Sequence, residues 1–186
     1  PQHLYLAPSD GSLPAVRLNG NLVSGGNVQI FRFSPDSARV VYLADQATDE
    51  VFELYSTTLA GPPVKLNQPL VSGGDVSSTP QGFGLSPDGA RVVFVADDET
   101  NDVFEIHRVP IDGSAAPVEL NTPLPSGGDV GSFAVSPDGG RVVFSAEQDV
   151  DNVLEIYTVP IAGGAVSQLN PTNADSVTKF ALNPDD

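Results

Sequence analysis

The chain is built from a repeat of about 50 residues, and this repeat strongly limits the folds it can adopt. The tripeptide Ser-Pro-Asp begins at Ser34, Ser86 and Ser136, and a related Asn-Pro-Asp begins at Asn183. Successive copies are therefore 52, 50 and 47 residues apart. A period in this range is typical of solenoids and propellers, in which each repeat is one supersecondary unit. The sequence therefore predicts an array of similar units.

Each repeat contains four short predicted strands. In the first copy, residues 31–33 alternate aromatic and polar side chains, and a period of two indicates a pleated strand. The Ser-Pro-Asp turn follows, where proline presets φ for a hairpin. After Arg39, residues 40–42 are apolar without alternation, as expected for a strand buried on both faces. A third strand over residues 51–55 and a fourth that ends at Leu66-Asn67 complete the unit.

No segment shows helical periodicity, and 18 Gly and 17 Pro residues suit many short strands joined by tight turns. Four-stranded antiparallel units at this period are blades that pack face to face around an axis, so the expected fold is an all-β propeller. We interpret residues 1–186 as a single, partial propeller domain. Its predicted repeats are approximately 28–67, 76–121 and 130–170, flanked by a half blade over 1–19 and a strand over 177–185.

The repeat resembles the WD-like repeat of TolB-type propellers. The matching features of the second copy are Ser-Pro-Asp-Gly from Ser86, Arg-Val-Val-Phe from Arg91, an acidic loop, Glu-Ile from Glu105, and Leu-Asn at Leu120. The resemblance covers the whole chain and implies the blade fold. It implies little about function, because that family includes periplasmic scaffolds, secreted binding proteins and the propeller domains of peptidases.

The charge of the chain excludes some partners. The 24 acidic and 8 basic residues give a formal net charge of −16. A field of this sign repels polyanions, so nucleic acids and anionic membrane surfaces are poor partners, whereas cations and cationic proteins fit. There is no cysteine, so disulfides and thiolate chemistry are excluded, and no apolar stretch is long enough to span a membrane.

The acidic residues are concentrated in loops that we expect on one face. Loops of a four-stranded meander alternate between two faces, so the loop between strands two and three shares a face with the loop between blades. These loops hold 13 of the 24 acidic residues: Asp45, Asp49, Glu50, Asp97, Asp98, Glu99, Asp102, Glu147, Asp149 and Asp151 between strands, and Asp75, Asp129 and Asp175 between blades. We call this set the acidic rim. Hard cations take several carboxylate and carbonyl oxygens, so one interpretation is a calcium site. The other is a solvated surface that confers solubility, because no loop has the spacing of an EF-hand.

Other recurrent polar residues have simpler interpretations. Glu53, Glu105 and Glu155 share one strand position, which we expect on the outward face of an outer strand. Arginines at equivalent positions, such as Arg39, are expected to pair with the Ser-Pro-Asp turn. His107 stands where the other repeats have tyrosine, and we interpret it as a strand side chain, not a metal ligand.

The sequence predicts a non-enzymatic, extracytoplasmic module that binds or scaffolds proteins, with calcium as the candidate ion. No catalytic motif is present: there is no nucleophile elbow, P-loop or zinc-protease helix. The alternatives are the propeller domain of a larger secreted or periplasmic hydrolase or peptidase, and a structural subunit of a surface layer or filament. The half blade indicates that further blades of a longer chain, or a second copy, complete the ring.

The packing of the blades leads to one further expectation. Phe31, Phe83 and Phe133 occupy equivalent positions in the first strand of each repeat. We expect all three to be buried between neighbouring blades, where burial of a phenylalanine contributes about 1.5–3 kcal/mol.

Overall fold

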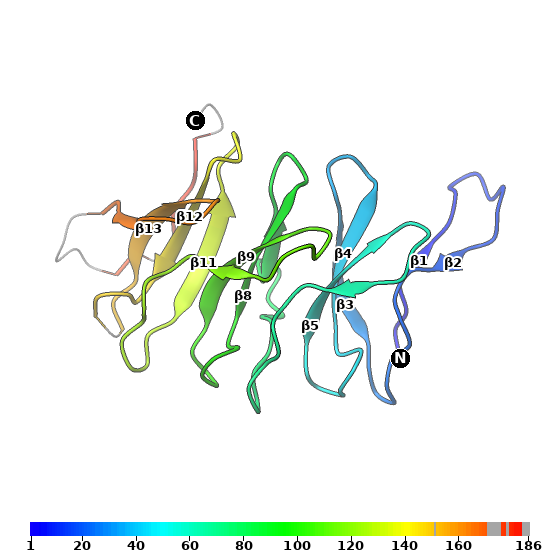
Figure 1. Cartoon of the computed structure of the whole chain (residues 1–186), viewed down its shortest axis with the longest axis horizontal. Helices are drawn as coiled ribbons and strands as arrows, with labels where there is room; N and C mark the ends of the chain where they lie inside the picture. Colours follow the sequence, from blue (N-terminus) through cyan, green and yellow to red (C-terminus); the bar gives the residue numbers. More distant parts are fainter. Residues whose placement is uncertain (151, 171–175, 178, 184–186) are drawn as a thin grey trace.

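The computed structural model describes residues 1–150, 152–170, 176–177 and 179–183. Three four-stranded antiparallel sheets stand side by side, and a two-stranded sheet lies at the N-terminal end (Figure 1). These sheets are the blades expected from the repeat, so the all-β propeller fold is confirmed. Within the described residues, no helix could span a lipid bilayer.

The strand order within each blade follows the chain. The half blade pairs β1 (Tyr5–Leu6) with β2 (Val16–Arg17). Blade 1 contains β3 (Val28–Phe33), β4 (Arg39–Ala44), β5 (Glu53–Thr58) and β6 (Val64–Lys65). Blade 2 contains β7 (Phe83–Leu85), β8 (Arg91–Ala96), β9 (Glu105–Pro110) and β10 (Val118–Glu119). Blade 3 contains β11 (Val130–Val135), β12 (Arg141–Ala146), β13 (Glu155–Pro160) and β14 (Ser167–Gln168). The strand expected over 177–185 falls partly outside the described residues, and residues 177 and 179–183 are not in a strand.

The Ser-Pro-Asp turn has the same hydrogen bonds in every blade. In blade 1, the Ser34 hydroxyl donates to Asp36 Oδ1 at 2.5 Å and accepts from the Arg39 backbone N–H at 2.9 Å. Asp36 Oδ1 also accepts from the N–H of Ala38 at 3.0 Å. The hydrogen bond from Ser34 holds the pKa of Asp36 below its usual value. The serine and aspartate therefore recur because together they satisfy the backbone of this hairpin.

The Leu-Asn pair at the end of each repeat joins the fourth strand to the third. The side-chain oxygens of Asn19, Asn67, Asn121 and Asn170 accept the backbone N–H groups of Leu4, Leu54, Ile106 and Ile156 at 2.7–2.9 Å. The fourth strands have only two residues each, so the asparagine replaces ladder hydrogen bonds that such short strands do not make. The leucine before it is buried in the first three copies (Leu18, Leu66 and Leu120).

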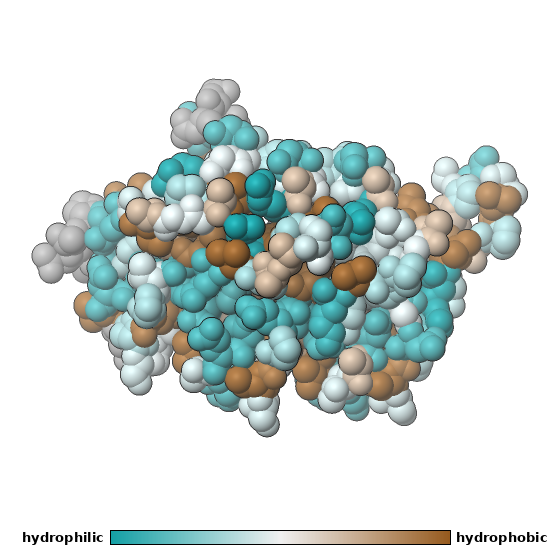
Figure 2. Space-filling model, viewed as in Figure 1, coloured by the Kyte–Doolittle hydropathy of each residue, from teal (hydrophilic) through white to brown (hydrophobic). Residues whose placement is uncertain are grey.

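The hydrophobic core lies between the blades. One cluster joins Val41 and Leu43 of blade 1 to Phe83 and Phe94 of blade 2, and a second joins blades 2 and 3. A third cluster places Leu4 of the half blade against blade 1. Figure 2 shows hydrophobic residues in groups along the lower edge and toward the right end, near β1 and β2.

The expectation that all three equivalent phenylalanines are buried between blades is wrong. Phe83 is buried and Phe133 packs partly against the second cluster, but 52% of Phe31 is exposed. Phe83 is covered by blade 1, which has four strands. The half blade before Phe31 supplies only β1 and β2, which correspond to the outer strands of a blade. Within the described part of the chain, no inner strand covers Phe31 on that side.

Candidate functional site

Two aspartates of the acidic rim organise the loops between strands two and three. In blade 2, Asp97 is buried and accepts the backbone N–H of Asp75 at 2.5 Å and that of Asp102 at 2.9 Å. Asp45 does the same in blade 1, accepting from Asn27 at 2.5 Å and from Glu50 at 3.3 Å. These bonds join the interstrand loop to the loop between blades, so the two kinds of loop do lie on one face.

A second pair of rim aspartates connects consecutive blades. Asp75 Oδ1 accepts the Phe52 N–H at 2.6 Å, and Asp129 Oδ1 accepts the Phe104 N–H at 2.8 Å. Burial raises the pKa of Asp75, and the nearby Asp97 adds to the rise, against the lowering by the Phe52 hydrogen bond. Four carboxylates of the rim thus accept backbone hydrogen bonds within and between blades.

Among the described residues, the remaining carboxylates of the acidic rim do not lie together in one site. Asp49, Glu50, Glu99, Asp102 and Asp149 are exposed, and Glu147 is half-buried, its backbone N–H donating to the Asp129 carbonyl. Asp98 is buried and faces inward toward His107. Asp151 and Asp175 lie outside the described residues.

The recurrent glutamates do not face outward as expected. Glu53, Glu105 and Glu155 are at most 9% exposed. In blade 1, Glu53 accepts the Tyr55 hydroxyl at 2.6 Å and pairs with Lys65. In blade 3, Glu155 accepts the Tyr157 hydroxyl at 2.5 Å and the Gln168 amide at 2.9 Å. A buried carboxylate needs such donors, and the tyrosine two residues later on the same strand face supplies one.

In blade 2 these donors are replaced. His107 stands in place of the tyrosine, and Glu119 stands in place of Lys65 and Gln168. Burial raises the pKa of Glu105 to about 7, and the charges of Glu119 and Glu99 add to the rise.

Each Ser-Pro-Asp turn is followed by an arginine, which was expected to pair with the turn. Among the described ion pairs, only the arginine of blade 2 does so. Arg91 lies 3.8 Å from Asp88. Arg39 instead donates to the Ser56 hydroxyl and Arg141 to the Thr158 hydroxyl, both on the adjacent third strand. Blade 2 has Arg108 at that position, which offers no acceptor.

An enlarged bulge in the first strand of blade 2 breaks the symmetry of the repeat. Blades 1 and 3 each have a one-residue bulge there, at Gln29 and Gly131. In blade 2 the bulge spans residues 77–81, because the N–H of Ser77 and the carbonyl of Gly82 both bond to the backbone of Val95. The sequence contains the signal for it: Ser86 lies ten positions after Val76, but Ser34 lies only six positions after Val28.

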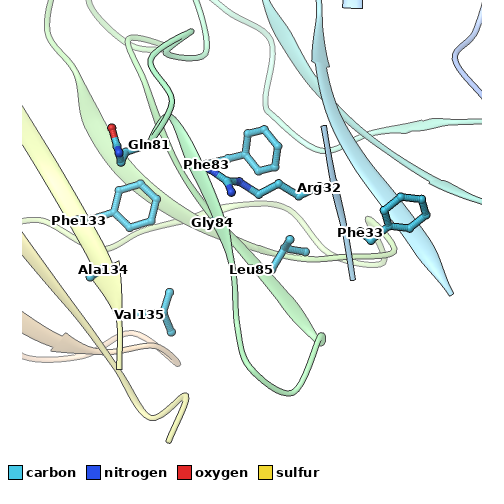
Figure 3. Close-up of a pocket in the computed structure, with 9 residues that line it drawn as sticks. All are labelled: Arg32, Phe33, Gln81, Phe83, Gly84, Leu85, Phe133, Ala134 and Val135. Atoms are coloured by element: carbon cyan, nitrogen blue, oxygen red, sulfur yellow. The ribbon is translucent and has the colours of Figure 1, made fainter. Parts of the chain in front are cut away.

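A hollow of about 460 Å³ opens beside this bulge, over the first strands of all three blades (Figure 3). Arg32 extends toward Phe83, with its guanidinium carbon 5.5 Å from the ring centroid, and donates to the Pro80 carbonyl at 2.6 Å. Phe133 and Gln81 also line the hollow. Its full lining is Arg32, Phe33, Gln81, Phe83, Gly84, Leu85, Phe133, Ala134 and Val135, which includes no acidic residue. A second hollow of about 300 Å³ lies against the same bulge, from Ser77 to Gly82.

The hollow combines exposed apolar surface with one cation in a strongly acidic chain. Such a surface can take an apolar or aromatic side chain together with a hydrogen-bond acceptor for the arginine. The sequence pattern indicates the acidic rim and does not reveal this surface, because the residues of the hollow come from three repeats and carry no motif.

Solved structures share this architecture. A putative TolB from Agrobacterium tumefaciens is 21% identical over 85% of this chain and 51% of its own, with a TM-score of 0.54. TolB from Acinetobacter baumannii is 18% identical over 91% of this chain and 38% of its own, with a TM-score of 0.53. A puromycin hydrolase is 20% identical over 99% of this chain and 31% of its own, with a TM-score of 0.64.

At these identities the likeness shows the fold alone. The chain spans about half or less of the length of each of these proteins. No curated protein matches it in sequence. The family model described as the lipoprotein LpqB β-propeller domain matches residues 41–184. Since that match covers most of the chain, the protein belongs to the family of the lipoprotein LpqB β-propeller domain.

Proposed function

We propose that this chain is a non-catalytic binding module of the cell envelope, and that it binds a protein segment in the hollow beside the enlarged bulge. The observation that carries the proposal is the bulge itself. The hydrogen bonds of turns and strands repeat from blade to blade, whereas residues 77–81 are specific to blade 2 and border two hollows. The envelope location is supported by the family, whose model is described as part of a lipoprotein.

The hollow fits a protein segment better than a polyanion. Six of its nine lining residues have apolar side chains, among them Phe83 and Phe133 on the first strands, and Arg32 is the cation. An extended segment could place one apolar side chain against Phe133, which is half-buried, and a carbonyl or carboxylate near Arg32. The charge of −16 on the whole chain disfavours nucleic acid and anionic lipid.

The test replaces the bulge with the connection found in blade 3. Substituting residues 77–81 by a single glycine mimics Gly131, so the blade should keep its four strands and its melting temperature within about 4 °C. A photo-crosslinking residue in place of Phe33, which lines the hollow, should capture one defined envelope protein. The bulge replacement should abolish that crosslink, because Arg32 loses its contact with Pro80. A crosslink that survives the replacement would contradict the proposed site.

The second candidate is the propeller domain of a larger hydrolase, a role favoured by the puromycin hydrolase that shares the fold. In that case, an α/β-hydrolase segment in the parent chain would supply the catalysis. The length of the parent chain and its activity on ester and peptide substrates distinguish this candidate from the binding module.

Calcium remains our proposal for the exposed carboxylates of the acidic rim. At about 10 mM Ca²⁺, a site of the weak extracellular class should stabilise the fold by about 1–3 kcal/mol, measured as a rise in melting temperature. A variant with Asp49→Asn, Glu50→Gln and Asp149→Asn should lose part of that gain, because all three side chains are exposed on the rim. If calcium at this concentration produces no rise, the rim is only a solvated surface.

A further inference from the structure

Blade 2 differs from its neighbours at three positions that surround one buried glutamate. Gln46 and Gln148 correspond to Asp98, Tyr55 and Tyr157 to His107, and Lys65 and Gln168 to Glu119. The glutamate itself is unchanged and is Glu105 in blade 2. Each substitution replaces a hydrogen-bond donor or neutral amide by a group that can ligate a metal ion.

His107 is buried and stacked on an aromatic ring, but its two ring nitrogens make no hydrogen bond. It is 2% exposed, and its ring stacks on Phe94 with the centroids 5.2 Å apart and the planes at 24°. Both Nδ1 and Nε2 are buried without a hydrogen bond, although a buried imidazole normally makes at least one. Its register neighbour on β10 is Glu119, whose carboxylate accepts from Asn121 at 2.8 Å.

A second atom without a hydrogen bond lies close to His107. Asp98 Oδ1 lies 3.2 Å from His107 Nε2, and neither atom is in a hydrogen bond. Two ligands of one tetrahedral zinc ion, each about 2.0–2.1 Å from the metal, are about 3.3 Å apart. The observed separation matches that of two atoms bound to a common ion, and it is also short enough for a direct ion pair between a protonated His107 and Asp98.

The carboxylate of Glu105 completes a group of three. One ligand atom from each of Asp98, Glu105 and His107 lies within 4.8 Å of the others. In blade 1 the corresponding carboxylate is compensated by Lys65, whereas blade 2 has the acidic Glu119 there. The group therefore carries more negative charge than the nearby hydrogen-bond donors compensate, and a bound cation would offset this charge.

We propose that Asp98, Glu105 and His107 bind one divalent transition metal ion of the Zn²⁺ class. One imidazole nitrogen with two carboxylate oxygens suits zinc, whereas calcium takes oxygen ligands in larger number. A water molecule would take the fourth position. In blades 1 and 3, the buried glutamate binds a tyrosine of the third strand and a lysine or glutamine of the fourth strand. In blade 2, the metal would take the place of these contacts.

This inference does not depend on the proposed binding function. The metal ligands come from β9 and from the loop that follows β8, whereas the hollow is lined from the first strands. Partner capture and metal binding can therefore fail separately.

The sharpest test gives blade 2 the residues of blade 3. The variant Asp98→Gln/His107→Tyr/Glu119→Gln should fold, because blade 3 makes the same network with Gln148, Tyr157 and Gln168. Calorimetric titration with Zn²⁺ alone should show one ion bound per native chain. The variant should lose affinity by more than about 100-fold, since even the outer partners of metal ligands contribute about 10- to 100-fold.

The other histidine provides the matched control. His3 lies in the half blade and contacts Asn19, so His3→Gln should change zinc affinity by less than about twofold. Co²⁺ bound to the native chain should give the visible absorption of a four-coordinate site, and the triple variant should not. Undiminished zinc binding by the triple variant would overturn the proposal. Native protein that binds no zinc at micromolar concentration, or binds Ca²⁺ as tightly at this site, would also overturn it.

Discussion

Asp97→Ala is expected to lower the free energy of unfolding by about 3 kcal/mol, because it removes two hydrogen bonds from backbone N–H groups to a buried carboxylate. The carboxylate now accepts from Asp75 in the loop between blades and from Asp102 in the interstrand loop. Asp102 has a positive φ of 62°, which is uncommon for a residue other than glycine, so its hydrogen bond also holds a strained conformation. The melting temperature should fall by about 6–12 °C in a chain of this size.

Asp49→Ala is the matched control for this effect. Asp49 belongs to the corresponding loop of blade 1 but is exposed, so its removal should change stability by less than about 0.5 kcal/mol. Urea denaturation of both variants in calcium-free buffer measures the effect of the lost hydrogen bonds on stability without a contribution from calcium binding. Equal stabilities for the two variants would show that the buried carboxylate does not organise the loops.

The sequence predicted the blades well because their determinants are local. Ser34 and Asp36 satisfy the hairpin that they occupy, and Asn67 bonds to a residue of the adjacent strand. Such contacts depend on residues close in the chain, so they recur whenever the motif recurs. The face shared by the acidic loops was also predictable, since it follows from the alternation of loops in a meander.

The environments of single side chains were less predictable. Glu53 was expected to face outward because carboxylates are rarely buried, but Tyr55 and Lys65 satisfy it. That pairing depends on the register between two strands, which the alternation of residues does not give. His107 and Glu119 were visible as departures from the repeat, but only the register places them opposite each other.

The hollow could be predicted only in part. The four extra residues between Val76 and Ser86 can be counted in the sequence, and they mark the place where blade 2 differs from the other blades. The contact between Arg32 and Phe83 joins two blades, and nothing in either repeat specifies it. Where the repeats match, they identify the fold. Where one repeat differs from the others, the difference marks a candidate site.

Phe83→Ala is expected to lower the free energy of unfolding by about 3–5 kcal/mol, the usual cost of removing a buried phenylalanine. Phe83 is 2% exposed in the cluster between blades 1 and 2, and it also lies beneath the Arg32 guanidinium. The cavity left behind has rigid walls, because Val41 and Leu43 belong to a strand with neighbours on both sides. Thermal unfolding should show a decrease of about 10 °C or more.

Phe31→Ala tests whether the loss of stability depends on burial of the phenylalanine or on its position in the repeat. The two phenylalanines are equivalent in the repeat, but 52% of Phe31 is exposed beside the half blade. Its removal should therefore cost less than about 1 kcal/mol in the isolated chain. A loss as large as that of Phe83→Ala would mean that another copy covers Phe31 in solution. Light scattering would then give a molar mass above the 19.3 kDa of one chain, and the Phe31→Ala substitution should reduce that mass toward the monomer value.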